Sequence, residues 1–168
     1  MSINIYVIEF DEDDPKKCTG KRMIKFGYAR KSYRPFGIVL NPLSQIPVSA
    51  EDRETVKRWG ITVIDSSWNK SNEEFFMKFN NKFSRRLPFL LAGNPINYAK
   101  PFKLSSIEAV AAALYIVEEV ELAYEIMNKV KWGHTFLELN RDLLELYKGK
   151  GKEEILNIEA EVMKGPQQ

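Results

Sequence analysis

The chain has 168 residues, of which 44% are hydrophobic and 12% aromatic, a length and composition typical of one compact domain or two small ones. A single cysteine excludes an internal disulfide framework, and one cysteine with one histidine provides too few ligands for a structural zinc site. We therefore expect a metal-free protein of the reducing cytoplasm. The N-terminal residues lack a basic leader, and every apolar run is too short to cross a membrane, so we expect neither export nor membrane insertion.

The net charge is only +2, but the positive charge is concentrated near the N-terminus. A stretch without any acid carries eight cations: Lys16, Lys17, Lys21, Arg22, Lys25, Arg30, Lys31 and Arg34. A local basic surface of this kind suits a polyanion such as RNA. The alternative is a solvated charged face, which is the more common case when charge is the only signal.

The first part of the chain alternates between strand and helix signals. Runs of β-branched and aromatic residues predict strands at 3–10, 36–40, 61–65 and 87–92. Capping signals predict helices at 54–59, after Ser49 and before Gly60, and at 73–83, after Ser71. This order predicts an α/β fold with parallel strand pairing.

The second part of the chain has only helical spacing. Ser105 and Glu108 form a further start signal, and helical patterns follow at 109–117, 121–130, 135–147 and 152–163. We therefore expect an α/β domain over residues 1–92, followed by a loop and an all-helical domain over residues 93–168.

The junction between these parts, LAGNPINYAKPFKLSS (91–106), has two prolines, a glycine and two asparagines, which exclude a regular helix or central strand. It is nevertheless too apolar for a solvated linker. Irregular segments of this length are uncommon inside a compact domain unless they line a site. We expect this loop to enclose a ligand.

Ligands of open α/β sheets bind beyond the carboxyl ends of the strands. Here those ends are Leu40-Asn41-Pro42, the segment from Ile64 to Trp68, and the loop that begins at Gly93. No GxGxxG or P-loop pattern is present, so the expected pocket is apolar and suits an adenosine-type ligand without phosphates. Asp65 and Trp68 project into this pocket, or else Asp65 caps a turn and Trp68 belongs to the core. For His134, a structural role is favoured over that of a general base.

Four ordered blocks of sequence resemble a known family: DPKKCTG (14–20), VIDSSW (63–68), the stretch 86–116 that begins RLPFLLAGNP, and KWGHTFLELNRDLLELY (131–147). The chain resembles the archaeal and eukaryotic small-subunit rRNA aminocarboxypropyltransferases from about residue 3 to residue 147. Two positions depart from the family's typical pattern. Ser66 replaces a cysteine, and Ala99 replaces a glycine, which matters only if that position requires a positive φ.

The resemblance implies a SPOUT-like fold, a parallel sheet with the chain knotted around the cofactor, followed by a helical domain. It also implies an activity: transfer of the 3-amino-3-carboxypropyl group of S-adenosylmethionine to N3 of a uridine or pseudouridine, which releases 5′-methylthioadenosine. The implied partner is small-subunit rRNA or the pre-ribosomal small subunit, with the protein acting as a monomer. The rival hypotheses are a knotted rRNA methyltransferase and an rRNA-binding assembly factor without activity.

The resemblance also assigns residues to the cofactor. It places Thr19 and Ser106 at the amino-carboxypropyl tail, Ile64 at the ribose, Leu87 and Phe102 at the adenine edge, and Leu40, Pro42, Trp68 and Leu104 around the adenine and methylene chain. Asp65 is the candidate catalytic residue, either accepting the N3 proton or offsetting the sulfonium charge. The eight N-terminal cations are the candidate phosphate contacts.

Overall fold

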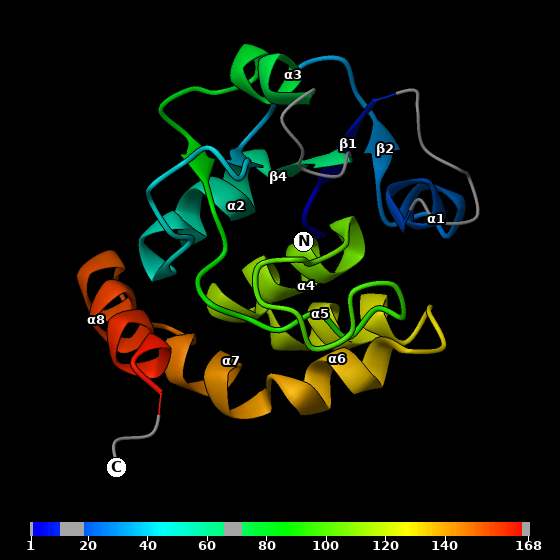
Figure 1. Ribbon diagram of the computed structural model, residues 1–168. Helices are drawn as coiled ribbons and strands as arrows, with labels where there is room; N and C mark the ends of the chain where they lie inside the picture. Colours follow the sequence, from blue (N-terminus) through cyan, green and yellow to red (C-terminus); the bar gives the residue numbers. More distant parts are fainter. Residues whose placement is uncertain (1, 11–18, 66–71, 166–168) are drawn as a thin grey trace.

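The computed structural model describes residues 2–10, 19–65 and 72–165 (Figure 1). Some residues named in the predictions therefore lie outside the described part of the chain: Lys16, Lys17, Ser66, Trp68 and Ser71. The elements up to the central loop are β1 (Ile5–Glu9), α1 (Thr19–Lys25), β2 (Arg30–Lys31), β3 (Ile38–Leu40), a 3-10 turn (Ala50–Asp52), α2 (Arg53–Trp59), β4 (Ile61–Asp65), α3 (Glu73–Lys78) and β5 (Ser84–Arg85). Of these, α1 and β2 were not predicted.

The described strands form a five-stranded sheet in the order β2-β1-β4-β3-β5, and every neighbouring pair is parallel. This confirms the predicted α/β class. The central strand β4 is buried along its whole length and pairs with β1 in a register that sets Asp65 opposite Glu9. Because the strands are parallel, their carboxyl ends lie at one edge of the sheet, as the sequence argument required.

Alternation along β4 divides its side chains between two apolar clusters. Ile61 and Val63 belong to the large core under the helices, whereas Ile64 belongs to a smaller cluster with Phe76 and Phe79, contributed by α3 and the residue that follows it. This is the period of two expected of a strand that is covered on both faces. Asp65 therefore follows Val63 on the face of the large core.

The C-terminal part consists of α4 (Ser106–Ile116), α5 (Val120–Met127), α6 (Gly133–Leu139), α7 (Arg141–Tyr147) and α8 (Lys152–Met163). Figure 1 shows α4 between the sheet and the helices α5, α6 and α7, and α4 contacts β4, α1, α5 and α7. The predicted helix 135–147 is divided at Asn140 into α6 and α7. No helix in the described part of the chain is both long enough and apolar enough to cross a membrane.

The predicted strand 87–92 is wrong, because the sheet strand at this place is the shorter β5 at Ser84–Arg85. The following residues are extended and bond elsewhere. Phe89 bonds through its N–H to Glu159 (2.8 Å) and through its carbonyl to the Tyr147 hydroxyl (2.9 Å). Leu91 bonds through its N–H and its carbonyl to the Asn140 amide, both at 2.7 Å. Side chains of the C-terminal part thus supply part of the pairing that a neighbouring strand would give, and the backbone of residues 99–102 supplies the rest.

The predicted helix 73–83 is also too long. α3 ends at Lys78, Phe79 follows as a turn, and the consecutive Asn80 and Asn81 are in neither helix nor strand. The Asn81 side chain accepts a hydrogen bond from the N–H of Phe83 (2.8 Å), a local bond that competes with helix continuation.

Candidate active site

Asp65 is the last residue of β4 and is only 5% exposed. Its Oδ1 accepts a hydrogen bond from the Ser106 hydroxyl, at the first residue of α4. The carboxylate thus lies at the N-terminus of an 11-residue helix, where the partial positive charge of the helix dipole favours a negative group. A buried acid at the carboxyl edge of the sheet is the arrangement predicted for a site there.

The start of α1 closes the other side of this carboxylate. A Cβ at Gly20 would lie 2.4 Å from Oδ2 of Asp65, so only glycine allows α1 to approach so closely. Thr19 is buried beside it, and its Oγ1 accepts a hydrogen bond from the N–H of Ile107 at 3.0 Å. Thr19, Asp65 and Ser106, from three separated stretches of sequence, therefore lie together, and Gly20, which the sequence analysis did not single out, lies against Asp65.

Glu108 organises the loop that precedes α4. It is completely buried, and its carboxylate accepts hydrogen bonds from the N–H of Gly93 (2.6 Å), the Asn94 amide (2.7 Å), and the N–H (2.9 Å) and hydroxyl (2.8 Å) of Ser105. Both ends of the loop are thus tied to one side chain. The sequence predicted Glu108 as a helix-capping residue but not as the anchor of the loop.

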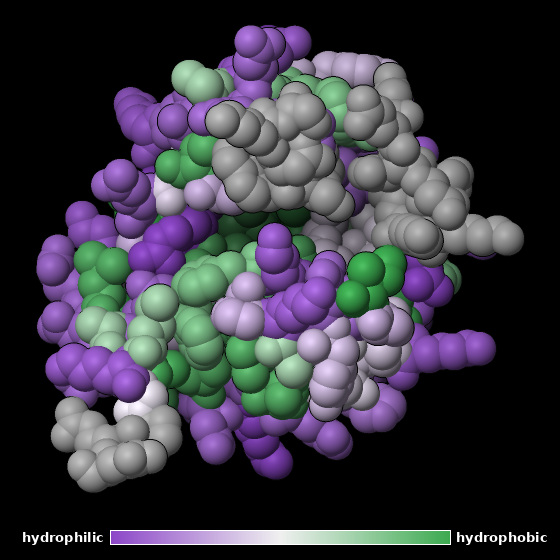
Figure 2. Space-filling model, viewed as in Figure 1, coloured by the Kyte–Doolittle hydropathy of each residue, from purple (hydrophilic) through white to green (hydrophobic). Residues whose placement is uncertain are grey.

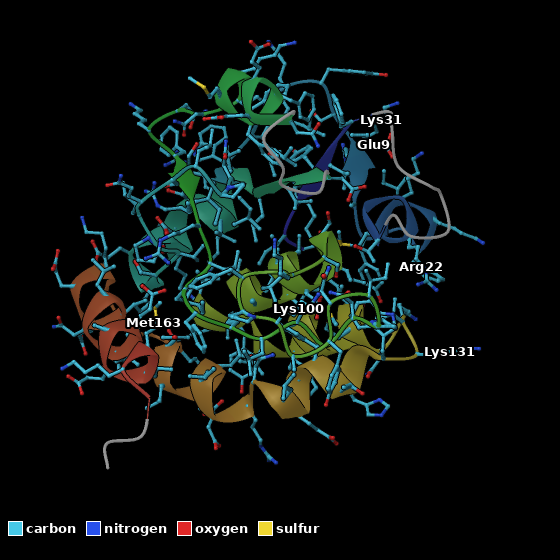
Figure 3. The ribbon with its side chains drawn as sticks, in the orientation of Figure 1. Glu9, Arg22, Lys31, Lys100, Lys131 and Met163 are labelled. Carbon is cyan, nitrogen blue, oxygen red and sulfur yellow. The ribbon has the colours of Figure 1, made fainter. Side chains whose placement is uncertain are left out.

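Figure 2 shows this face of the molecule hollowed above the loop, with hydrophobic surface at the floor of the hollow. In Figure 3, Lys100 marks the loop in front of α4. The half-buried Leu87 and Leu104 and the buried Leu40 all pack with the large core under α4. Two residues predicted to wall the adenine, Leu40 and Leu104, and one predicted at its edge, Leu87, therefore lie on the same face of the sheet as Asp65.

Two other predicted cofactor contacts, Ile64 and Pro42, do not belong to the large apolar core. The side chain of Ile64 belongs to the cluster on the opposite face of the sheet, so only its backbone is available to a ligand beside Asp65. Pro42 is exposed just beyond β3. His134 is exposed on α6.

Two residues of the loop have left-handed backbone conformations that are unfavourable for side chains other than glycine. Ala99 has a φ of 64° and Phe102 a φ of 61°. Strain of this kind, at a cost of about 1–3 kcal/mol for each residue, collects at ligand sites. Phe102 is half exposed, and its ring meets that of Phe89 edge to face, with 5.6 Å between the centroids. The position of Ala99 does require a positive φ, so the departure from glycine there carries an energetic cost.

Residues 38–163 match the protein family described as "Ribosome biogenesis protein, C-terminal". The 16S rRNA aminocarboxypropyltransferase of Saccharolobus solfataricus is 48% identical over 161 residues, which cover 96% of each chain. The protein of that name from Methanobrevibacter smithii is 47% identical over 152 residues, 86% of this chain and 88% of its own. The chain belongs to the 16S rRNA aminocarboxypropyltransferase family.

A solved member of this family has the same fold over nearly the whole chain. It is described as the SAM-dependent rRNA:acp-transferase Tsr3 from Vulcanisaeta distributa, with 32% identity, a TM-score of 0.81, and coverage of 98% of this chain and 100% of its own. A further match, over residues 3–32, is described as "Possible Fer4-like domain in RNase L inhibitor, RLI". Iron–sulfur clusters of that type are held by four cysteine thiolates. The present chain has one cysteine in all, so its residues do not fit an iron–sulfur cluster.

The N-terminal cations of this aminocarboxypropyltransferase family member differ in their availability. Lys25, Arg30, Lys31 and Arg34 are exposed, whereas Lys21 and Arg22 are half-buried. Lys31 lies 3.3 Å from a carboxylate oxygen of Glu9 (Figure 3), and this hydrogen bond raises the pKa of its ammonium group. Among the described residues, no group of three His, Cys, Asp or Glu side chains is placed to hold a metal ion.

Proposed function

We propose that this protein transfers the 3-amino-3-carboxypropyl group of S-adenosylmethionine to N3 of a uridine or pseudouridine in 16S rRNA during ribosome biogenesis. The observation that carries the proposal is the group formed by Asp65, Ser106 and Thr19 beneath an ordered loop, in a chain of this family. The proposal includes a chain knotted around the cofactor, a monomeric state, separate domains at 1–92 and 93–168, and a cytoplasmic location.

The residues around Asp65 suit this cofactor chemically. A buried carboxylate favours a positive charge nearby, such as the sulfonium or the ammonium of the tail. The N-terminus of α4, at Ser106, and the hydroxyl of the buried Thr19 suit the tail carboxylate, while the Ser106 hydroxyl itself donates to Asp65. Leu40, Leu87 and Leu104 provide apolar surface for the adenine, and the backbones of Ile64 and Phe102 are the proposed polar contacts. Pro42 and Trp68 remain proposed wall residues.

When bound, the cofactor supplies an electrophilic carbon attached to a positively charged sulfur. The bond from N3 to the γ-carbon forms while the bond from that carbon to sulfur breaks, its electron pair stays on sulfur, and the N3 proton leaves. All three carbons on the sulfur are electrophilic, so the carbon placed in line with N3 decides the product. Asp65 accepts the N3 proton or offsets the positive charge, and its bond with Ser106 fixes its orientation.

The test uses two preparations of the cofactor, one labelled in the methyl group and one in the carboxypropyl chain, with 16S rRNA as acceptor. We expect only the chain label on the RNA, with release of methylthioadenosine. A methyl label on the RNA, with S-adenosylhomocysteine as product, would mean a methyltransferase. Absence of both labels from the RNA would mean an rRNA-binding factor without activity.

Asp65→Asn tests the catalytic assignment. We expect the rate of transfer to fall about 100-fold or more, the usual contribution of a general base, while RNA affinity stays unchanged. Glu9→Gln is a matched control, because Glu9 ends the neighbouring strand in register with Asp65 and pairs with Lys31 instead. A wild-type rate and cofactor affinity in Asp65→Asn would remove Asp65 from the mechanism.

We also propose that the N-terminal cations contact RNA phosphates. The set is Lys16, Lys17, Lys21, Arg22, Lys25, Arg30, Lys31 and Arg34. Phosphate contacts predict an affinity that falls steeply with salt and depends little on sequence. Because Lys31 is already paired with Glu9, Lys25→Gln and Arg34→Gln should each reduce the salt dependence more than Lys31→Gln.

A further inference from the structure

A second hollow lies at the other end of the sheet from Asp65. It has a volume of about 390 Å³ and is lined by Phe36, Trp59 and Phe83, which we call the aromatic hollow, together with smaller residues that include Thr55 and Asn81. Phe36 and Phe83 are 37% and 39% exposed, and Trp59 is 59% exposed. Three large exposed rings around one hollow are a feature that marks binding surfaces rather than ordinary protein surface.

A cation lies over each of these rings. The distance to the ring centroid is 5.8 Å from the Arg34 guanidinium to Phe36, 5.7 Å from Arg58 to Trp59, and 5.3 Å from the Lys82 ammonium to Phe83. Rings flanked by cations are the combination that binds single-stranded nucleic acid, because bases stack on the rings and phosphates pair with the cations.

The walls of the aromatic hollow are held by hydrogen bonds within the protein. The Thr62 hydroxyl of β4 bonds both the N–H (2.8 Å) and the carbonyl (2.7 Å) of Phe36. Phe83 is held through its N–H by Asn81 (2.8 Å) and through its carbonyl by the N–H of Val39 (3.0 Å). A preformed surface binds without the cost of ordering it.

The aromatic hollow is separate from the site at Asp65 but continuous with the surface that carries the N-terminal cation Arg30. Phe36 precedes β3 and Trp59 precedes β4, so four residues of β4 at about 3.3 Å each, or about 13 Å, separate this edge of the sheet from Asp65. The ring of Tyr6 packs 4.8 Å from that of Phe36, and Arg30 lies over Tyr6. Cations and rings thus form one surface from Arg30 to the hollow.

We propose that the aromatic hollow binds an unpaired base of the rRNA substrate by stacking on Trp59 and Phe83, with Arg34, Arg58 and Lys82 on the adjoining phosphates. This inference rests on the proposed function, which supplies the RNA. It adds a second point of attachment, at the opposite end of the sheet from the reacting base, so that the enzyme requires a stretch of single-stranded RNA near its target.

The test measures the affinity of the whole protein for a single-stranded 16S rRNA fragment, without cofactor and at one fixed salt concentration. Trp59→Ala should weaken binding about 5- to 100-fold, the range for loss of one base stack, whereas Trp59→Phe should keep most of the affinity. Tyr124→Ala is the control, because it removes another exposed aromatic ring, from α5 (40% exposed against 59% for Trp59), and should leave affinity unchanged. Thermal unfolding of each variant verifies that it is folded.

A direct readout is photo-crosslinking of RNA that contains 4-thiouridine. Crosslinks should map to the peptides that contain Trp59 or Phe83 and disappear in Trp59→Ala. Equal losses of affinity in Trp59→Ala and Trp59→Phe, or unchanged affinity in Trp59→Ala, would overturn the proposal. Crosslinks from the aromatic hollow to a ribosomal protein, and none to RNA, in intact small subunits would also overturn the proposal.

These outcomes are independent of the transfer reaction. If the wild type transfers no label to rRNA but Trp59→Ala still weakens RNA binding, the proposed function fails and the stacking site stands. If the wild type transfers the label and the variant binds RNA normally, the proposed function stands and the stacking site fails.

Discussion

Two extended and largely buried segments of this protein obtain their backbone hydrogen bonds in different ways. In β4 the bonds run to the backbones of β1 and β3. In residues 89–94, which we call the anchored segment, they alternate between two kinds of partner. Phe89, Leu91 and Gly93 bond to helix side chains, whereas Leu90 and Ala92 bond to the backbone of residues 99–102.

The difference decides how each segment depends on sequence. A backbone ladder survives most changes of side chain, because every residue type brings the same N–H and carbonyl. The anchored segment depends on the individual side chains of Glu108, Asn140, Tyr147 and Glu159. The loop that closes the proposed cofactor site continues directly from this segment. The geometry of that site therefore also depends on these four side chains.

The strongest test of this contrast is Glu108→Ala. It removes the acceptor of four hydrogen bonds at a completely buried position, and we expect unfolding to become easier by about 3–5 kcal/mol, at the upper end for a single substitution. Urea denaturation measures the loss. Cofactor affinity should fall as well, because both ends of the loop are released.

Ile61→Val, in β4, is the comparison for this variant. Ile61 is also completely buried, and removing one methylene there should cost only about 0.5–1.5 kcal/mol. Equal losses for the two variants would mean that the loop is held by packing and not by the Glu108 carboxylate.

The same contrast explains which parts of the fold the sequence predicts. β1, β3 and β4 appear as apolar runs because a buried parallel strand needs such residues on both faces. Residues 87–92 have a similar apolar composition, but Phe89 and Leu91 bond to side chains 49 to 70 positions away, a pairing that composition does not encode. The two-residue strands β2 and β5 are too short to produce any periodic signal.

The residues of the candidate site could be predicted from the sequence to different degrees. Asp65 follows from position alone, as an acid that closes a buried strand. Thr19 and Ser106 followed only from the family resemblance, because nothing in their local sequence indicates that α1 and α4 meet at Asp65. Phe36, Trp59 and Phe83 lie at the ends of three different predicted elements, and nothing in the sequence indicates that they meet, so only the fold reveals the aromatic hollow.

A smaller and pH-dependent effect is expected for Asn140→Asp. Its Oδ1 can still accept from the N–H of Leu91, but the amide that donates to the carbonyls of Leu91 and Phe136 is lost. Burial beside two carbonyl oxygens raises the pKa of the new carboxyl in the folded state above its unfolded value, because the charged form is disfavoured there.

The sign of the pH dependence follows from that raised pKa. Below the unfolded pKa the carboxyl is protonated in both states and can donate to one carbonyl, so the variant should lie closest to the wild type in acid. As pH rises through the unfolded pKa and towards the folded one, the variant should lose about 1–3 kcal/mol relative to the wild type. Urea midpoints of both proteins across this range measure the difference. A gap that is independent of pH would contradict a direct bond between residue 140 and Leu91.

The smallest expected effect is a gain of stability, in Ala99→Gly. Ala99 donates its N–H to the carbonyl of Ala92 and so completes the backbone pairing of the anchored segment, but it does so at a φ of 64°. Glycine adopts that conformation without steric cost, and the relief exceeds the entropy that a more flexible unfolded chain gains, so unfolding should become harder by about 0.5–1 kcal/mol. Ala160→Gly, at an exposed interior position of α8, should instead destabilise by about 1 kcal/mol. Opposite signs for the two substitutions, read from thermal unfolding, would establish that the loop is held against the local preference of its own sequence, which is the property that separates it from β4.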